Sequence, residues 1–248
     1  MRYIIGDIGN TSTKICILNH KFKILKSYDC ETYNIYKKNY LKKIIQKQLK
    51  NNLNPILLFS SVVPHVFREI KKKFKSTKYK IFEIKKFDLR KIIKIKVKNI
   101  KQLGSDRIVN AIGARNYKNC IIVDFGTATT FDIINNYAYE GGVIAPGVAL
   151  SIKNLSKAAA LLPAINLRYN KKSFGKNTVD ALNAGFVWGY EGLISNIISK
   201  IVSRKRSKYK IILTGGYANF FKKTIKGKVL IDQNITVKGI AKVYKEFV

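Results

Sequence analysis

The chain of 248 residues carries 48 Lys and Arg against 14 Asp and Glu, which gives a formal net charge of +34, and 46% of its residues are hydrophobic. A chain of this size buries a core without help from a metal or a disulfide, and its three Cys and two His show no zinc-ligand spacing, which favours a reducing, cytoplasmic compartment. The early carboxylate at Asp7 and the lack of a long apolar run exclude a signal peptide and a membrane span, so we expect neither secretion nor membrane insertion.

The positive charge is distributed along the chain. Lysines cluster in several stretches, at 37–50, 71–80, 85–101, 171–176, 204–210 and 222–228. A composition rich in Ile, Asn, Tyr and Phe, with one Trp and four Pro, is typical of an AT-rich coding sequence and explains the lysines without a ligand. A nucleic-acid surface would gather its charge on one face beside a recognition motif, and the sequence contains no such motif. We therefore expect no specific nucleic-acid partner.

The first predicted element is a β-hairpin. An apolar run at 3–5 breaks at Gly-Asp-Ile-Gly-Asn-Thr over 6–11 and resumes at 15–18, as two buried strands around a glycine turn do. Apolar spacing then predicts helix 35–49, strand 56–63 ended by Pro64, helix 66–74, and helix 105–116 after Gly104. Ser105 is expected to cap that last helix.

The opening pattern returns in the middle of the chain. Residues 121–130 again run from an apolar strand through Asp, a spacer and Gly into a hydroxyl-rich turn. The alignment pairs Asp7 with Asp124, Gly9 with Gly126 and Thr13 with Thr130. A repeat at about half the chain length predicts an α/β fold of two similar lobes, residues 1–115 and 116–248, around a central cleft.

Two further elements belong to the second half. A strand at 211–214 ends in the pair Gly215-Gly216 and leads into a helix. Before it, apolar residues at helical spacing predict a long helix of about six turns over 179–201.

The turn over 7–14 has the chemistry of a phosphate site. Gly9 allows a close backbone approach, and the N–H and hydroxyl groups around it can hold phosphate oxygens. Asp7 at its edge offers the hard oxygen that Mg²⁺ prefers. One copy would equally fit an ordinary turn, in which Asp, Gly, Asn and Thr are common. Two copies facing a cleft favour a nucleotide clamp, while Lys14 either touches phosphate or is one more solvated lysine.

The sequence Gly-Ser-Asp-Arg over 104–107 offers a proton acceptor. Asp106 falls in the first turn of a predicted helix, where backbone N–H groups favour its ionised form, and an ionised Asp can accept a hydroxyl proton during phosphoryl transfer. Arg107 could hold a substrate carboxylate by two hydrogen bonds. Taken alone, the pattern favours a capped helix start. We interpret Asp132 and Asp180 as structural.

Eight motifs occur in a fixed order along nearly the whole chain. They are Asp7-Ile-Gly-Asn-Thr, Ser61-Val-Val-Pro64, Gly104-Ser-Asp-Arg107, Asp124-Phe-Gly-Thr-Ala-Thr-Thr130, Gly141-Gly-Val-Ile-Ala-Pro-Gly147, Leu162-Pro163, Gly175-Lys-Asn-Thr178 and Thr214-Gly-Gly216. In order and approximate spacing they resemble the motifs of the type III pantothenate kinases. That family belongs to the actin-like, sugar-kinase and Hsp70 superfamily, whose duplicated ribonuclease H-like lobes would explain the repeat.

The resemblance implies ATP-dependent phosphorylation of pantothenate to 4′-phosphopantothenate, the first step towards coenzyme A, with Mg²⁺ and potassium or ammonium as cofactors. The implied proton acceptor is Asp106, and the implied pantothenate contacts are Gly104, Ser105, Asp106, Arg107 and Thr178. The implied ATP contacts are Asp7, Gly9, Asn10, Thr11, Lys14 and Thr127. Asp7 would lie nearest Mg²⁺, and Asp124 would bind the monovalent cation. Thr178 would close the pocket of a neighbouring subunit, so a homodimer is also implied.

The chain departs from the family pattern on the pantothenate side. Val97 stands where many members carry a Tyr seven residues before Gly104, and Ile100 stands where a Pro often follows Asn99. Loss of the Tyr removes a possible hydrogen bond, which would weaken substrate binding without abolishing phosphoryl transfer.

Two alternative functions remain open at this point. Relatives of the Bvg accessory factor type are linked to transcriptional regulation, so a DNA-associated homologue without kinase activity is one alternative. A pure binding module would have no physical reason to keep the set Asp7, Asp106 and Asp124, which argues against it. The other alternative keeps the fold and phosphorylates a different small hydroxy acid.

Overall fold

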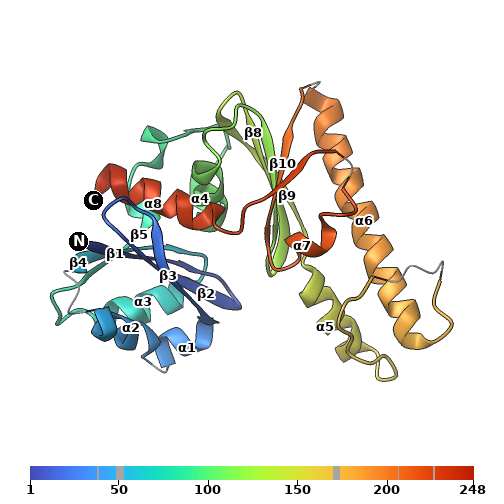
Figure 1. Ribbon diagram of the computed structural model, residues 1–248, viewed down its shortest axis with the longest axis horizontal. Coiled ribbons are helices and arrows are strands. Elements are labelled where there is room, and N and C mark those ends of the chain that lie inside the picture. The colour runs from blue at the N-terminus through green and yellow to red at the C-terminus, as the bar shows by residue number, and fades with distance from the viewer. Residues whose placement is uncertain (38, 49–52, 170–173, 206, 226) are drawn as a thin grey trace. The chain divides into compact units, whose positions relative to one another are not determined.

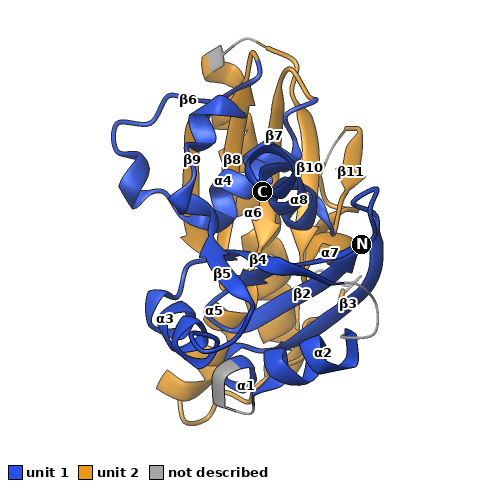
Figure 2. Cartoon of the chain, turned by 90° about the vertical axis from the view of Figure 1, so that its left-hand side faces the viewer, with its two compact units in different colours: residues 1–116, 137–140, 234–248 blue, residues 117–136, 141–233 orange. Residues whose placement is uncertain are grey.

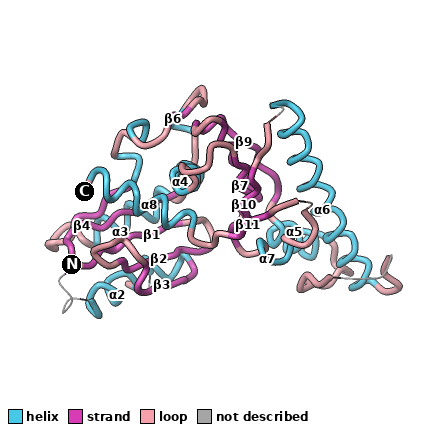
Figure 3. The backbone as a smooth tube through the Cα atoms, turned by 45° about the horizontal axis from the view of Figure 1, so that its top comes forward, coloured by secondary structure: helices cyan, strands magenta, loops and turns pink. Residues whose placement is uncertain are grey.

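The computed structural model describes the whole chain except residues 38, 49–52, 170–173, 206 and 226. It contains two compact units, coloured separately in Figure 2: residues 1–116, 137–140 and 234–248 form the first, and residues 117–136 and 141–233 form the second. Two mixed sheets with helices packed on them make the chain an α/β protein, as the sequence predicted (Figure 3). The lobe boundary near residue 115 stays a prediction.

The first sheet joins five strands in the order β3-β2-β1-β4-β5. Their bounds are β1 Arg2–Ile8, β2 Ser12–Leu18, β3 Ile24–Glu31, β4 Leu53–Ser61 and β5 Lys80–Glu83. β1 and β2 form the predicted hairpin, in which Tyr3 pairs with Leu18. β1, β4 and β5 run parallel. Their carboxyl ends therefore lie at one edge of the sheet, where open α/β sheets carry their functional residues.

Helices cover both faces of the first sheet (Figure 1). One face carries α1 Thr32–Lys37, α2 Tyr40–Gln48 and α3 Pro64–Lys73, and the other carries α4 Ser105–Gly113 and α8 Ile235–Phe247. The single helix expected over 35–49 is wrong, because the chain forms α1 and α2 around Asn39, whose φ of 51° is left-handed. The last residue of that prediction, Leu49, lies outside the described residues.

Alternation along β1 decides which side chains face which helices. Ile4 and Ile8 are fully buried in the cluster formed with α1, α2 and α3. Because successive strand residues point to opposite faces, Asp7 lies on the face that α4 and α8 cover. Between β5 and α4 the chain runs through the short 3₁₀ turns η2 Ile84–Lys86, η3 Leu89–Lys91 and η4 Ile100–Gln102, with strand β6 Lys94–Ile95 among them.

The second sheet has the strand order β11-β10-β7-β8-β9-β6. Its further strands are β7 Cys120–Phe125, β8 Ala128–Asn135, β9 Ala138–Pro146, β10 Lys210–Gly215 and β11 Val229–Ile231. β7 and β8 form the second predicted hairpin, and β10 runs parallel to β7. Helices α5 Val148–Ala158, α6 Thr178–Lys205 and α7 Ala218–Phe221 share one apolar cluster with these strands.

The long helix predicted over 179–201 is present as α6, with 28 residues. At 1.5 Å per residue it measures about 42 Å, close to eight turns and longer than expected. One stripe, which includes Tyr190 and Ile194, is buried against the second sheet, whereas Val179 and Trp188 are about half exposed. None of the helices in the described part of the chain is both long and apolar enough to cross a membrane.

Candidate active site

The first turn joins β1 to β2 and is held by Thr32 at the start of α1. The Gly9 N–H donates to the Ser12 carbonyl at 3.0 Å, which closes the turn. The Thr32 hydroxyl donates to the Gly9 carbonyl at 2.6 Å, and its N–H donates to the Thr11 carbonyl at 3.0 Å. Asn10 and Thr11 are exposed, as the predicted phosphate contacts must be. Sequence reasoning missed Thr32, because the contact joins residues 23 positions apart.

Asp7 lies beside Lys14 and Ser60 at the end of the first sheet. It pairs with Lys14 on β2 and with Ser60 on β4, so the three side chains share a face. The Lys14 amine lies 3.9 Å from Asp29, and the Lys14 side chain keeps 30% of its surface exposed. Ser60 is fully buried, and its hydroxyl has no hydrogen-bond partner among the described residues. A carboxylate, an ammonium group and a hydroxyl therefore meet where phosphate binding was predicted.

The start of α4 fixes the Asp106 carboxylate. Gly104 is the N-cap residue, so the prediction that Ser105 caps the helix is wrong: the Ser105 hydroxyl donates to the Glu83 carboxylate at 2.6 Å instead. The Asp106 carboxylate accepts the Arg107 N–H at 2.7 Å. It lies so close to Gly104 that a Cβ at residue 104 would overlap it. A side chain at residue 104 would therefore displace the carboxylate from this position.

Burial raises the pKa of Asp106 above its ordinary value of 3.8. The N–H and guanidinium of Arg107 and the Lys85 ammonium pull the pKa down, yet the loss of hydration outweighs them. The expectation that the helix start would favour the ionised form is therefore incomplete, because burial has the larger effect. A carboxylate with a raised pKa accepts a proton more readily than a solvated one.

Glu83 supports the start of α4 and was not foreseen from the sequence. One carboxylate oxygen accepts the Ser105 hydroxyl, and the other accepts the Lys85 N–H at 2.7 Å. A backbone hydrogen bond from Ser61 adds a third contact. Burial raises the pKa of Glu83 above 4.5 despite these contacts. Glu83 lies at the end of β5, so it ties α4 to the sheet.

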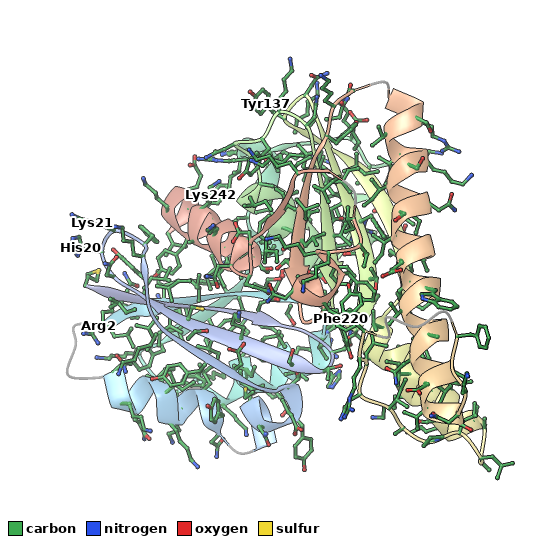
Figure 4. The ribbon with its side chains drawn as sticks, turned by 45° about the vertical axis from the view of Figure 1, so that its right-hand side comes forward. Arg2, His20, Lys21, Tyr137, Phe220 and Lys242 are labelled. Atoms are coloured by element: carbon green, nitrogen blue, oxygen red, sulfur yellow. The ribbon has the colours of Figure 1, made fainter. Side chains whose placement is uncertain are left out.

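Helix α8 holds the other end of α4. The Lys242 amine donates to the carbonyls of Ile112 and Gly113, the last residues of α4, at 3.1 and 3.3 Å (Figure 4 labels Lys242 on α8). Burial lowers the pKa of Lys242 to about 8. A cation at a helix carboxyl end suits the helix dipole. Both ends of α4 are therefore anchored by side chains from outside the helix.

The two predicted sites of the first unit share one edge of the first sheet. Asp7 is in register with Ser60 on β4, and Phe59 on β4 is in register with Glu83 on β5. Glu83 accepts the Ser105 hydroxyl, and this hydrogen bond attaches the segment over 104–107, which contains Asp106, to the carboxyl ends of the same parallel strands. The structure thus brings the predicted phosphate turn and the predicted proton acceptor to one edge, within one unit.

The second turn is one residue shorter than the first. The Gly126 N–H donates to the Ala128 carbonyl at 3.1 Å, and Asp124 pairs with Thr130, as Asp7 pairs with Lys14 in the first hairpin. The alignment of Thr13 with Thr130 is therefore wrong by one position. The true counterpart is Thr129, which pairs with Phe125 as Thr13 pairs with Ile8. Thr127 is exposed at the tip of this turn.

Glycines from neighbouring elements approach the second turn. Gly215 has a φ of 83°, and a Cβ there would lie 2.7 Å from the Asp124 carboxylate and 2.6 Å from the Phe125 carbonyl. The Gly216 N–H donates to that carbonyl at 3.1 Å. Gly147, before α5, lies so close that a Cβ would overlap the Thr127 carbonyl. The predicted glycine-pair strand therefore ends against Asp124.

Thr178 lies at the start of α6, away from this hairpin in the sequence. It is exposed, as are Val179 and Asp180. The Asn177 carboxamide accepts the Asp180 N–H at 2.9 Å and donates to the Asp180 carboxylate at 3.0 Å. This pair caps the helix and confirms the structural interpretation of Asp180.

The acids of the two turns could hold a metal ion only as single carboxylates, with the other ligands supplied by waters and phosphate oxygens. The described residues contain no group of three or more His, Cys, Asp or Glu placed to hold an ion. Mg²⁺ in kinases keeps waters and phosphate oxygens and takes only one or two carboxylates. Asp7 fits that mode, and beside it lies the Ser60 hydroxyl, which has no hydrogen-bond partner in the described part of the chain. Asp124 also presents a single carboxylate, and its role as ligand of a monovalent cation stays a prediction.

Known proteins resemble the chain over almost its whole length. Residues 3–200 match the family model described as Type III pantothenate kinase. A type III pantothenate kinase from Pelagibacter ubique (strain HTCC1062) is 49% identical over 239 residues, which cover 96% of each chain. One from Sulfurihydrogenibium sp. (strain YO3AOP1) is 33% identical over 246 residues, covering 94% of this chain and 96% of its own.

Among solved structures, a Baf family transcriptional activator from Campylobacter jejuni matches with a TM-score of 0.64 at 23% identity, covering 98% of both chains. That likeness concerns the fold alone, which is the fold of the actin-like ATPases.

Proposed function

Because the chain belongs to the type III pantothenate kinase family and is a kinase of that type, we propose that Asp106 accepts the proton of the pantothenate hydroxyl while the Asp7 turn holds the phosphates of ATP. The hydroxyl oxygen then bonds to the γ-phosphorus of ATP. The bond from that phosphorus to the β–γ bridging oxygen breaks, and ADP leaves. The products are 4′-phosphopantothenate, ADP and the proton on the Asp106 carboxylate.

The observation that carries the proposal is the fixed position of the Asp106 carboxylate. It lies against Gly104 and accepts the Arg107 N–H, at the same sheet edge as Asp7. Its raised pKa suits a proton acceptor. Arg107 is proposed to bind the carboxylate of pantothenate, since a guanidinium binds carboxylates by two parallel hydrogen bonds.

Phosphate contacts are proposed on each turn separately. In the first turn, Gly9, Asn10 and Thr11 offer backbone and side-chain donors and Lys14 offers a charge; in the second turn, Thr127 offers an exposed hydroxyl. Asp7 is the residue that would hold Mg²⁺, which neutralises phosphate charge when bound. Asp124 would hold potassium or ammonium. We also place the enzyme in the cytosol, where its three free cysteines stay reduced.

We also propose a homodimer, which is supported by exposed apolar side chains on α5, on α6 and at Leu161. Leu161 is 94% exposed and Trp188 is 46% exposed, and exposed apolar clusters of this kind mark interfaces. A second copy of the chain is the proposed partner, and the exposed Thr178 is proposed to close its pocket. In sedimentation experiments the unaltered chain should be a dimer, and the Trp188→Glu variant should be a monomer.

The transcription-linked alternative has no observation in its favour. The relatives that match most of the chain are kinases, and the likeness to the Campylobacter jejuni protein carries only the fold.

Replacing Asp106 by Asn tests the proton acceptor. The turnover number should fall about 10³-fold, within the range for loss of a general base, while calorimetry finds ATP binding unchanged. Asp88→Asn is the matched control, because Asp88 also accepts a backbone N–H at a helical start but is exposed. Asp106→Asn with more than a tenth of the normal turnover would refute the role.

The pH profile gives an independent check. The acceptor must be ionised, so kcat/KM for pantothenate should fall as the pH drops through the raised pKa of Asp106. A profile that turns down only near 3.8, the ordinary value, would contradict the buried carboxylate as the titrating base.

Glu83 is proposed as a positioning residue that acts through Ser105. Glu83→Gln and Ser105→Ala should each lower kcat about tenfold, since a hydrogen bond to a charged group contributes about 1.5–3 kcal/mol. The double variant should lose less than the sum of the two single losses, because both replacements weaken the same Ser105–Glu83 hydrogen bond. The KM for ATP should stay within about twofold, because the first turn is untouched. Additive losses would contradict a shared role.

A further inference from the structure

Lys85 is joined to the start of α4 through its backbone. It lies in the 3₁₀ turn η2, and Glu83 is the N-cap residue of that turn. One Glu83 carboxylate oxygen accepts the Lys85 N–H at 2.7 Å, and the other accepts the Ser105 hydroxyl at 2.6 Å. A single carboxylate therefore fixes the Lys85 backbone beside the residue that precedes Asp106.

The Lys85 side chain reaches the same segment by a second route. Its ammonium group donates to the Lys101 carbonyl at 3.5 Å. Lys101 lies in η4, shortly before Gly104, the N-cap residue of α4. The two routes therefore meet the chain on either side of Gly104, at Lys101 and at Ser105. The Asp106 carboxylate lies against that glycine, so the contacts of Lys85 bracket its position.

The charged groups near Asp106 differ in what they can supply. Arg107 and Lys85 are the two cations that lower the pKa of Asp106, against the larger effect of burial. The guanidinium of Arg107 is proposed to bind the carboxylate of pantothenate, which would neutralise it. Glu83 is itself an acid, and Lys242 on α8 contacts the opposite end of α4. Of the two cations, Lys85 is thus the one without an assigned substrate contact.

We propose that Lys85 is a positioning residue whose ammonium group keeps Asp106 in the ionised, proton-accepting form while Arg107 binds the substrate carboxylate. This inference rests on the proposed function, in which Asp106 is the proton acceptor. Burial favours the neutral form of a carboxyl group, which cannot accept the hydroxyl proton, and a nearby positive charge offsets that effect. Because Lys85 is exposed, water and salt screen its charge in part.

The pH profile of Lys85→Met tests the proposal. The variant keeps the backbone contact with Glu83 and loses only the charge, so Asp106 should become protonated at a higher pH than in the unaltered chain. At saturating substrates, kcat should fall about threefold on the acidic limb of the profile and stay within about 1.5-fold on the alkaline plateau. An equal loss at every pH would mean a merely structural role and would overturn the proposal.

Lys86→Met is the matched control. Lys86 is the next residue of the same turn, is also exposed, and places its ammonium 3.9 Å from the centroid of the Phe82 ring. Its replacement changes the net charge equally, yet kcat should change less than about 1.5-fold at any pH. Lys85→Arg keeps the charge and should restore the normal profile. Matching profiles for Lys85→Met and Lys86→Met would mean a general charge effect and would overturn the proposal.

An uncharged acceptor separates this role from direct binding of the substrate. Pantothenyl alcohol has a hydroxyl in place of the pantothenate carboxylate, and the loss of kcat on the acidic limb of Lys85→Met should persist with it. A higher KM for pantothenate alone, with an unmoved kcat profile, would assign Lys85 to the substrate carboxylate and would overturn the proposal.

An NMR titration of the Asp side-chain carboxyl groups, without substrate, gives a readout independent of turnover. The Asp106 signal, assigned by its loss in Asp106→Asn, should titrate at a higher pH in Lys85→Met, and the difference should shrink in about 1 M salt. If Asp106→Asn is inactive and the titration does not move, the inference on Lys85 fails and the proposed function stands. If Asp106→Asn remains active, the proposed function fails and this inference fails with it.

Discussion

The two hairpins share a sequence pattern but differ in how the turn is supported. In the first, the Thr32 hydroxyl donates to the Gly9 carbonyl at 2.6 Å and meets the Thr13 hydroxyl at 3.0 Å. In the second, support comes from glycine backbones, because Gly215 and Gly147 lie against the turn. A duplicated motif can therefore keep its acid at the end of the strand while the surrounding contacts diverge.

The shorter second turn changes what faces each aspartate. Asp7 has Lys14 opposite it, whereas Asp124 has Thr130. A lysine beside the acid supplies a charge for phosphate, and a threonine supplies none. The first turn is accordingly the better candidate for the charged phosphates. Asp124, approached by Gly215 and without that lysine opposite, suits a monovalent cation better.

The largest expected effect separates the two acids. Asp7→Asn should lower kcat about 10³-fold at saturating ATP, because it removes the carboxylate proposed for Mg²⁺. Asp124→Asn should instead raise the concentration of potassium needed for half-maximal activity. Steady-state rates over magnesium and potassium titrations distinguish the two. If both variants lose activity in the same way with the same ion dependence, the two turns do not have different roles.

The hairpins themselves were predictable, and their surroundings were not. The apolar runs on either side of Gly9 and Gly126 fix strand, turn and strand by local periodicity, and both hairpins are confirmed. Strand β3 was missed because its residues are mostly exposed and show no apolar alternation. The one-residue difference in turn length was also missed, since both turns end in several hydroxyl residues that align equally well.

Residues whose contacts lie far away in the sequence could not be predicted from local sequence patterns. Asp106 was found because glycine, serine and arginine surround it in a recognisable motif. Glu83 lies 22 positions from Ser105 in a lysine-rich segment, and only the parallel pairing of β4 with β5 brings the two together. The prediction that the helix start favours ionised Asp106 was incomplete for the same reason, because the pKa of Asp106 also depends on burial, which composition and spacing do not encode.

The intermediate effect comes from comparing Gly215 with Gly227, and it tests whether Gly215 supports the second turn. Gly215→Ala should lower the free energy of unfolding by about 2–4 kcal/mol, because a positive φ costs about 1–2 and the Cβ would collide with Asp124 and Phe125. Gly227→Ala is the matched control: its φ is 99°, but nothing lies within 4 Å of its Cβ position. Gly227→Ala should therefore lose only the cost of the positive φ, about 1–2 kcal/mol. Equal losses in urea unfolding would mean that contact with Asp124 contributes nothing.

The smallest effect compares two of the buried threonines, Thr32 and Thr129. Thr32→Val removes the hydroxyl bonded to the Gly9 carbonyl and should cost about 1–3 kcal/mol, and it should raise the KM for ATP because the first turn loosens. Thr129→Val removes a fully buried hydroxyl that has no hydrogen-bond partner in the described part of the chain, so stability should be unchanged or higher.

Thermal melts and ATP titrations of both threonine variants measure this difference. A destabilised Thr129→Val would show that the second turn also relies on a hydroxyl contact, and the two hairpins would then be supported alike. A stable Thr32→Val with normal ATP binding would remove Thr32 from the phosphate site. The opposite responses we expect follow from one physical rule: a buried hydroxyl stabilises a turn only where an acceptor meets it.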